Sequence, residues 1–193
     1  MTDHGPNPDA FAEAEARVRA AEFRDDFAVR EIPSPQGIAP RSLALAGDVR
    51  PEAHGDSPYG TGRFILLHDP EEPEAWGGAF RIVSFAQAPL EPEIGTDPLL
   101  ADVTWSWLID ALDSRGAAYH SASGTATKTL STGFGGLAGE GDGAQIELRA
   151  SWTPEGDPLV HVEAWAELVC MLAGLPPGSE QIAVFGARKA ERD

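Results

Sequence analysis

The chain has 193 residues, of which 42% are hydrophobic, and its 31 acidic and 14 basic side chains give a formal net charge of −17. A chain of this length buries enough surface in one domain to fold without a metal, and its one cysteine excludes an internal disulfide. The acidity disfavours nucleic-acid binding, because the protein repels a phosphate backbone.

The start of the chain and its hydropathy predict a cytoplasmic protein. No basic stretch precedes an apolar one, as it would in a signal peptide. No apolar run approaches the ~18 residues of a membrane span, and a single cysteine fits a reducing compartment. The acidity is typical of surfaces that keep a protein soluble, and a basic partner or a sticky client is the alternative interpretation.

The first forty residues predict a tail, one helix and one strand. Residues 1–9 contain two prolines, a glycine and polar side chains, so we expect a disordered tail. Apolar side chains recur at helical spacing from Phe11 to Phe23, with Asp9 as the N-cap. A strand candidate at 26–32 leads into a proline-rich, extended connector.

Three more strand candidates occupy residues 41–49, 62–69 and 79–88. Turn-rich segments separate them at hairpin-like distances, which predicts antiparallel pairing. The last two candidates are apolar on both sides, as strands covered on both faces of a sheet would be.

Two later helices begin and end with the same residue types. Asp97 and Asp157 are predicted N-caps, each followed by a proline at the first helical position, where the missing N–H is no loss. Gly116 and Gly174 are predicted to terminate these helices.

Between those helices the sequence predicts a hairpin. A serine- and threonine-rich run at 118–132 and an alternating run at 144–152, with Arg149 and Ser151 on its outward side, are strand candidates. The glycine loop 133–143 between them formally matches G-x-G-x-x-A, but no helix follows it, as a dinucleotide site would require.

Together these elements predict an α+β fold, with a single domain over residues 10–177. Its antiparallel sheet would have about five to six strands and three helices, in the order helix, three or four strands, helix, two strands, helix. Residues 178–193 would form a mostly flexible C-terminal extension, with a short edge strand at 181–185.

Aromatic and histidine side chains on the two later helices are candidate binding residues. Helical projection places Trp105 and Trp107 at opposite borders of one apolar face, where core packing is favoured and a pocket or interface is the alternative. His161 projects onto the same apolar face as Trp165. A hydrogen-bonded core histidine is favoured there, and a general base or pH-sensitive group is the alternative.

The remaining polar candidate residues give no indication of a catalytic or metal site. His68 and Asp69 at a strand end would suit acid–base work, but a turn capped by Asp69 is favoured. Cys170 lies on the side of Glu163 and Glu167, which raise a thiol pKa and argue against a nucleophile. No H-x-x-x-H or H-x-H pair, cysteine pair, phosphate loop or G-x-S-x-G motif occurs, so we expect no metal and no cofactor.

Four segments, GRFILLHDPEEPEAWGGAFRIVSF, DPLLADVTWSWLIDAL, IELRASWTP and HVEAWAELVCMLAGLPP, together resemble an actinobacterial family catalogued as domain of unknown function 3000 (DUF3000). The resemblance runs from about Phe11 to Pro177. It implies a cytoplasmic protein of a high-GC Gram-positive bacterium and carries over no activity and no site residues. The order of elements is also similar to secretion-chaperone-type folds, which bind extended peptides, but this likeness is topological only.

These observations favour a non-catalytic, acidic, cytoplasmic interaction module that binds a protein segment or self-associates, at a sheet edge or beside Trp105 or Trp165. The alternative is a small-molecule-binding protein or an unrecognised enzyme, with a pocket bounded by Trp107, Trp165, His161 and His68. The alternative requires His161 to face a water-reachable site, and it fails where His161 is sealed against a backbone carbonyl.

Overall fold

The computed structural model describes residues 10–49 and 60–176. Outside these residues lie the predicted tail 1–9 with its N-cap Asp9, the extension 178–193 and the strand 181–185. In chain order the elements are α1 (Ala10–Arg19), β1 (Phe27–Ile32), β2 (Arg41–Val49), β3 (Thr61–His68), β4 (Phe80–Leu90), α2 (Pro92–Gly95), α3 (Leu100–Ser114), β5 (Tyr119–Thr132), the 3-10 helix η2 (Gly135–Glu140), β6 (Asp142–Pro154) and α4 (Pro158–Leu172).

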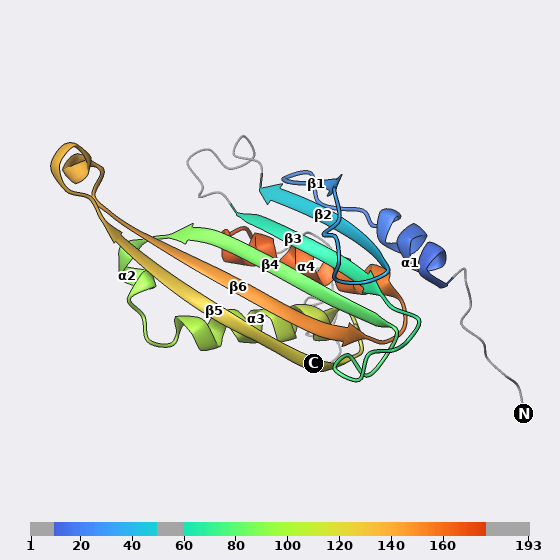
Figure 1. Cartoon of the computed structure of the whole chain (residues 1–193). Coiled ribbons are helices and arrows are strands. Elements are labelled where there is room, and N and C mark those ends of the chain that lie inside the picture. Colours follow the sequence, from blue (N-terminus) through green and yellow to red (C-terminus); the bar gives the residue numbers. More distant parts are fainter. Residues whose placement is uncertain (1–9, 50–59, 177–193) are drawn as a thin grey trace, which may run out of the picture.

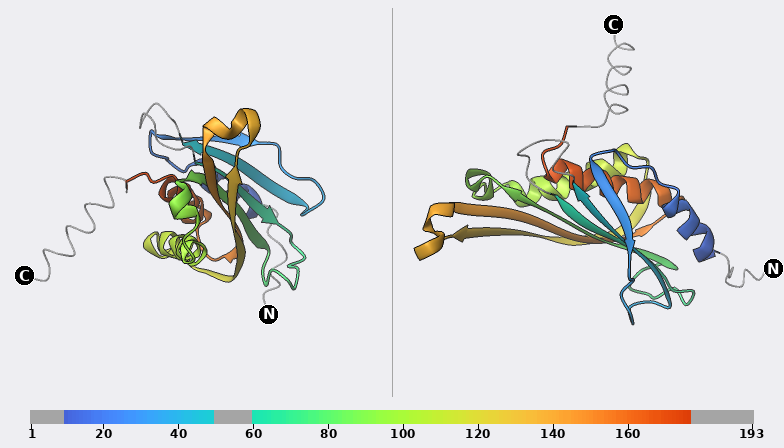
Figure 2. Two further views of the ribbon diagram at one scale, coloured as in Figure 1. Left: turned by 90° about the vertical axis from the view of Figure 1, so that its left-hand side faces the viewer. Right: turned by 90° about the horizontal axis from the view of Figure 1, so that it is seen from above.

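Six strands form one antiparallel sheet, which confirms the predicted α+β class and the predicted kind of sheet. The strand order is β1-β2-β3-β4-β6-β5, and every pairing is antiparallel. Figures 1 and 2 show the helices on one face of this sheet and the long hairpin of β5 and β6 reaching beyond the other strands. The short helix α2, with four residues, is additional to the three predicted helices.

Side chains alternate between the face that carries the helices, called here the helix face, and an open face. Core residues such as Trp152 point to the helix face and are fully buried. The expectation that 62–69 and 79–88 are covered on both faces is wrong, because the helices cover one face only. On the open face, cross-strand neighbours such as Ile65 and Val83 shield one another and remain half-buried.

Several predicted bounds differ by a few residues in the structure, those of α1 and β4 among them. Helix α1 ends at Arg19 rather than Phe23, because the chain leaves the helix and packs the Phe23 ring edge-on against Phe27, with 6.2 Å between the ring centroids. Strand β4 continues past the predicted end and includes Pro89, which pairs with Gln145 of β6.

Helix α4 begins and ends as predicted. Asp157 Oδ1 accepts a hydrogen bond from the Leu159 backbone N–H at 3.0 Å, and Pro158 is the first helical residue. Gly174 follows the helix with a φ of +74°, a conformation that glycine adopts without a steric penalty.

Helix α3 begins later than predicted. Asp97 Oδ1 accepts a hydrogen bond from the Leu99 N–H at 2.8 Å, as a cap would. However, the Leu100 N–H bonds to the Asp97 carbonyl at 3.3 Å, so a tight turn precedes the helix, which begins at Leu100. The predicted start at Pro98 is therefore wrong, whereas Gly116 ends the helix with a φ of +65° as predicted.

Trp165 of α4 sits on a pair of glycines in the sheet. Gly47 of β2 and Gly62 of β3 are cross-strand neighbours. A Cβ built on Gly47 would lie 2.8 Å from the Trp165 ring, and one built on Gly62 would lie 2.9 Å from its Nε1. The rings of Phe27 and Phe64 flank the indole, at centroid distances of 5.6 and 5.7 Å. We call these two glycines the indole seat, because only residues without a side chain leave room for the ring.

Gly62→Ala tests the indole seat. The added methyl group would overlap Val169 and Trp165, so urea unfolding should give a free energy of unfolding lower by about 1–3 kcal/mol, the range for an overpacked core. Gly143→Ala of β6 is the control, because nothing lies within 4 Å of its new methyl group and the change should be neutral or slightly stabilising. An equal loss in the free energy of unfolding in both variants would show that Gly62 is not needed to accommodate the indole.

Candidate functional site

The two tryptophans of α3 lie at opposite borders of its buried face. Leu108 and Leu112 are fully buried between them, whereas Trp105 and Trp107 are each half-buried. Trp105 packs against β5, where a Cβ built on Gly124 would lie 2.7 Å from its ring. The two rings therefore pack at separate borders of the helix and do not form one joint binding site.

His161 and Trp165 of α4 are both sealed in the core, with no exposed surface. His161 Nδ1 accepts a hydrogen bond from Trp152 Nε1 at 3.1 Å, which leaves the proton on Nε2, 3.4 Å from the Glu155 carbonyl. Burial lowers the pKa of His161, so the ring is neutral at pH 7. No atom of the ring reaches solvent, as in the favoured interpretation of a core histidine, so this geometry gives no support to the alternative of a pocket at His161.

His68 at the end of β3 is buried between two aromatic rings. The centroids of Phe11 and Phe80 lie 5.7 and 4.6 Å from that of the imidazole. Its Nδ1 has no hydrogen-bond partner among the described residues, and burial lowers its pKa. Asp69 Oδ1 accepts a hydrogen bond from the Glu71 N–H at 3.0 Å, as the turn interpretation predicts.

The other polar positions considered in the sequence provide neither a nucleophile nor a metal site among the described residues. Cys170 is buried, and burial raises the pKa of its thiol to about 12, so it stays protonated at neutral pH. Within residues 10–49 and 60–176, no three His, Cys, Asp or Glu side chains lie close enough together to hold a metal ion. None of the helices in this part of the chain is long and apolar enough to cross a membrane.

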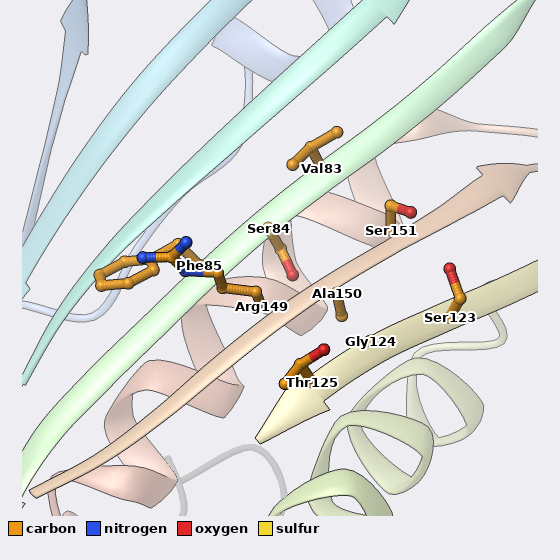
Figure 3. Close-up of a pocket in the computed structure, with 9 residues that line it drawn as sticks. All are labelled: Val83, Ser84, Phe85, Ser123, Gly124, Thr125, Arg149, Ala150 and Ser151. Carbon is orange, nitrogen blue, oxygen red and sulfur yellow. The ribbon is translucent and has the colours of Figure 1, made fainter. Parts of the chain in front are cut away.

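A groove of about 470 Å³ lies on the open face, across β4, β6 and β5 (Figure 3). Side chains that line it from these strands are Val83, Phe85, Arg149, Ser151, Ser123 and Thr125. Figure 3 shows the Arg149 guanidinium reaching over the Phe85 ring, with Cζ 5.8 Å from the ring centroid. The open-face groove thus combines an apolar wall, three hydroxyls and a cation.

Arg81 lies beside the open-face groove and is only 8% exposed. Its guanidinium donates to the Ser121 carbonyl at 2.9 Å, to Thr153 Oγ1 at 3.0 Å and to Ser151 Oγ at 2.7 Å. Ser121 has a φ of +55° within a β-bulge of β5, and this backbone conformation is energetically unfavourable for residues other than glycine. Among the described residues no carboxylate forms an ion pair with Arg81, so neutral oxygens alone surround a nearly buried positive charge.

The groove cannot be predicted from the sequence pattern of any one strand. The alternation of β6 correctly places Arg149 and Ser151 outward, but the strand register then decides which residues of β4 and β5 lie beside them. One signal is present in the sequence. Arg81 interrupts the apolar run 79–88, and a charge in a strand that is otherwise apolar on both sides requires partners on one of its faces.

Burial of His161 predicts that the protein loses stability in mild acid. The pKa of His161 is lowered in the folded state, so between that pKa and the unfolded value of about 6.5 the unfolded chain binds more protons. The free energy of unfolding should therefore fall as pH decreases through this window, with a slope approaching about 1.4 kcal/mol per pH unit for this group. In His161→Gln, whose amide oxygen can still accept from Trp152, urea unfolding should show a shallower decline. An unchanged pH dependence would refute this assignment.

Comparison with known proteins places the chain in a family. A family model described as "Protein of unknown function (DUF3000)" matches residues 7–182. This range includes every described helix and strand, from α1 to α4. Neither a curated protein nor a solved structure matches the chain. The chain therefore belongs to the DUF3000 family, as its sequence motifs predict.

Proposed function

We propose that the chain is a non-catalytic, cytoplasmic interaction module that self-associates by pairing β5 of two copies along their free edges. The free edge is the observation that carries the proposal. β5 has 14 residues and pairs with β6 on one side, while its other side ends the sheet in the described part of the chain. An edge of this length presents a row of N–H and C=O groups that is a template for another strand.

The chemistry of the edge favours a second copy of the chain as the occupant. No acidic residue occurs from Tyr119 to Gly139, although the whole chain has 31. The one lysine in this stretch, Lys128, donates a hydrogen bond to the Asp97 carbonyl at 3.0 Å. Two chains that each carry a net charge of −17 repel each other, and a strand without acidic side chains of its own lets them meet with less repulsion than an acidic strand would.

The end of the hairpin adds apolar surface to the same element. Leu130, Phe134 and Leu137 are 57%, 80% and 57% exposed, and Figure 1 shows this end projecting beyond the other strands. In an antiparallel pair, the end of each hairpin runs beside the beginning of the partner's β5. Pairing would thus remove these apolar side chains from water while it satisfies the backbone of the edge.

The alternative of a small-molecule pocket or an enzyme at His161 lacks comparable support. His161 and Trp165 are sealed in the core, and Trp107 packs at the border of α3. An interaction role needs only surfaces that are exposed in one copy, which the β5 edge and the hairpin end supply.

Charge placed on the edge should separate the two copies. Sedimentation equilibrium of the wild-type chain at micromolar concentration should give twice the mass of one chain. Thr127→Asp combined with Thr129→Asp brings like charges together across the pairing axis, so the dimer dissociation constant should rise at least about tenfold.

A matched variant controls for charge alone. Gln36→Asp combined with Ile38→Asp adds the same charge at two exposed positions of the connector between β1 and β2, and the dimer should persist. A wild-type chain that stays monomeric at about 100 μM, far above the dissociation constant of a stable dimer, would overturn the pairing. So would equal effects of the edge variant and the control.

A further inference from the structure

The open face of the sheet is locally basic in a strongly acidic protein. On the three strands β3, β4 and β6, the side chains that alternate onto this face include Arg63, Arg81 and Arg149 and only one carboxylate, Glu147. The chain as a whole has more than twice as many acidic as basic residues. On these three strands the open face therefore carries a net positive charge, opposite in sign to that of the whole chain.

The basic side chains surround an apolar strip. In the strand register, Phe85 has Arg63 as its neighbour on β3 and Arg149 as its neighbour on β6. In the next row, Val83 lies between Ile65 and Ser151. Cross-strand neighbours on one face are in contact distance, so this arrangement offers apolar contacts and cations to one and the same ligand.

We propose that the open-face groove binds an extended acidic segment of a partner protein. Apolar side chains of the segment would cover Val83 and Phe85, and its carboxylates would meet Arg149 and Arg63. The charges of the groove complement such a segment and repel a basic one. This inference rests on the interaction role proposed above but not on the pairing of β5.

Ser151 connects Arg81 to the groove by a hydrogen bond. Its Oγ accepts a hydrogen bond from Arg81 Nη2 at 2.7 Å and also lines the groove. A hydroxyl that already accepts from a guanidinium keeps its own hydrogen free to donate, and a carboxylate is the strongest acceptor that a protein segment offers. Arg81 is thus a positioning residue, whereas Ser151 would touch the ligand.

Glu147 supplies a carboxylate to Arg149 while the groove is free. The Arg149 Nε lies 2.6 Å from Glu147 Oε1, and the Arg149 side chain is 71% exposed. An ion pair this exposed contributes little to stability, so its removal leaves the fold intact. The same removal would leave Arg149 without a local counter-charge and thereby favour an incoming carboxylate.

Opposite effects of two neighbouring substitutions test the proposal. The probe is a fluorescein-labelled peptide that alternates glutamate with leucine and phenylalanine, and the readout is its fluorescence anisotropy at increasing protein concentration. Arg149→Gln should weaken binding at least about tenfold, and Glu147→Gln should tighten it about threefold or more. Arg19→Gln on α1, whose guanidinium also pairs with glutamates, is the matched control and should bind like the wild type.

Three outcomes would overturn the acidic-segment site. The first is absence of acidic-peptide binding at about 1 mM protein, the weakest affinity of interest. The second is equal binding of a peptide with lysine in place of glutamate, and the third is equal affinity of the Arg149→Gln and Arg19→Gln variants.

The monomeric edge variant Thr127→Asp/Thr129→Asp tests whether peptide binding requires self-association. Thr127 pairs with Glu147 on the open face, so its aspartate adds a carboxylate near Arg149 and should weaken peptide binding slightly rather than abolish it. The groove reaches β5 through Ser123 and Thr125, but neither Thr127 nor Thr129 lines it. A monomeric edge variant that still binds the acidic peptide supports both proposals as independent. A wild-type chain that dimerises but does not bind the peptide would overturn the acidic-segment site and leave the pairing of β5 standing.

Discussion

The packing of one indole on two glycines determines how the rest of the molecule is arranged. Trp165 can approach the sheet only because Gly47 and Gly62 face each other across β2 and β3. Its Nε1 also donates to the Phe85 carbonyl at 3.3 Å, which satisfies the one polar atom of a ring that has no exposed surface. Helix α4 is therefore held at a fixed distance over β2, β3 and β4, and the core closes around that contact on a single face.

Closure of the core on one face leaves the other face available for binding. Phe85 contributes to both faces of the sheet. Its carbonyl accepts a hydrogen bond from Trp165 Nε1 of the helix face, and its ring lies under Arg149 on the open face. The strand that anchors the core thus also presents the apolar wall of the open-face groove (Figure 3). A rigid strand is a more accurate platform for a binding residue than a loop, because its backbone is fixed by pairing on both sides.

Local signals in the sequence predict local structure well and predict contacts poorly. The Asp157-Pro158 start of α4 depends on residues next to each other in the chain, and it forms as expected. His161 and Trp165 are correctly placed on one apolar face, but only the packing of α4 on the sheet shows that this face is completely sealed. Arg81 meets Ser151 because the register of β4 against β6 brings them together, and no spacing within either strand encodes that register.

Pairing of β5 would place the grooves of two copies on the same side of the dimer, where one partner could occupy both. Two antiparallel copies of one strand in a continuous sheet are related by an axis perpendicular to that sheet, so both open faces point the same way. Ser123 and Thr125 of β5 line the groove, so the grooves of the two copies would lie on either side of the paired edges. A partner with two acidic stretches could then occupy both grooves, and the second contact would form at the high effective concentration set by the first. The acid-free edge and the basic face would in this way form one bivalent surface on a protein that otherwise repels acidic partners.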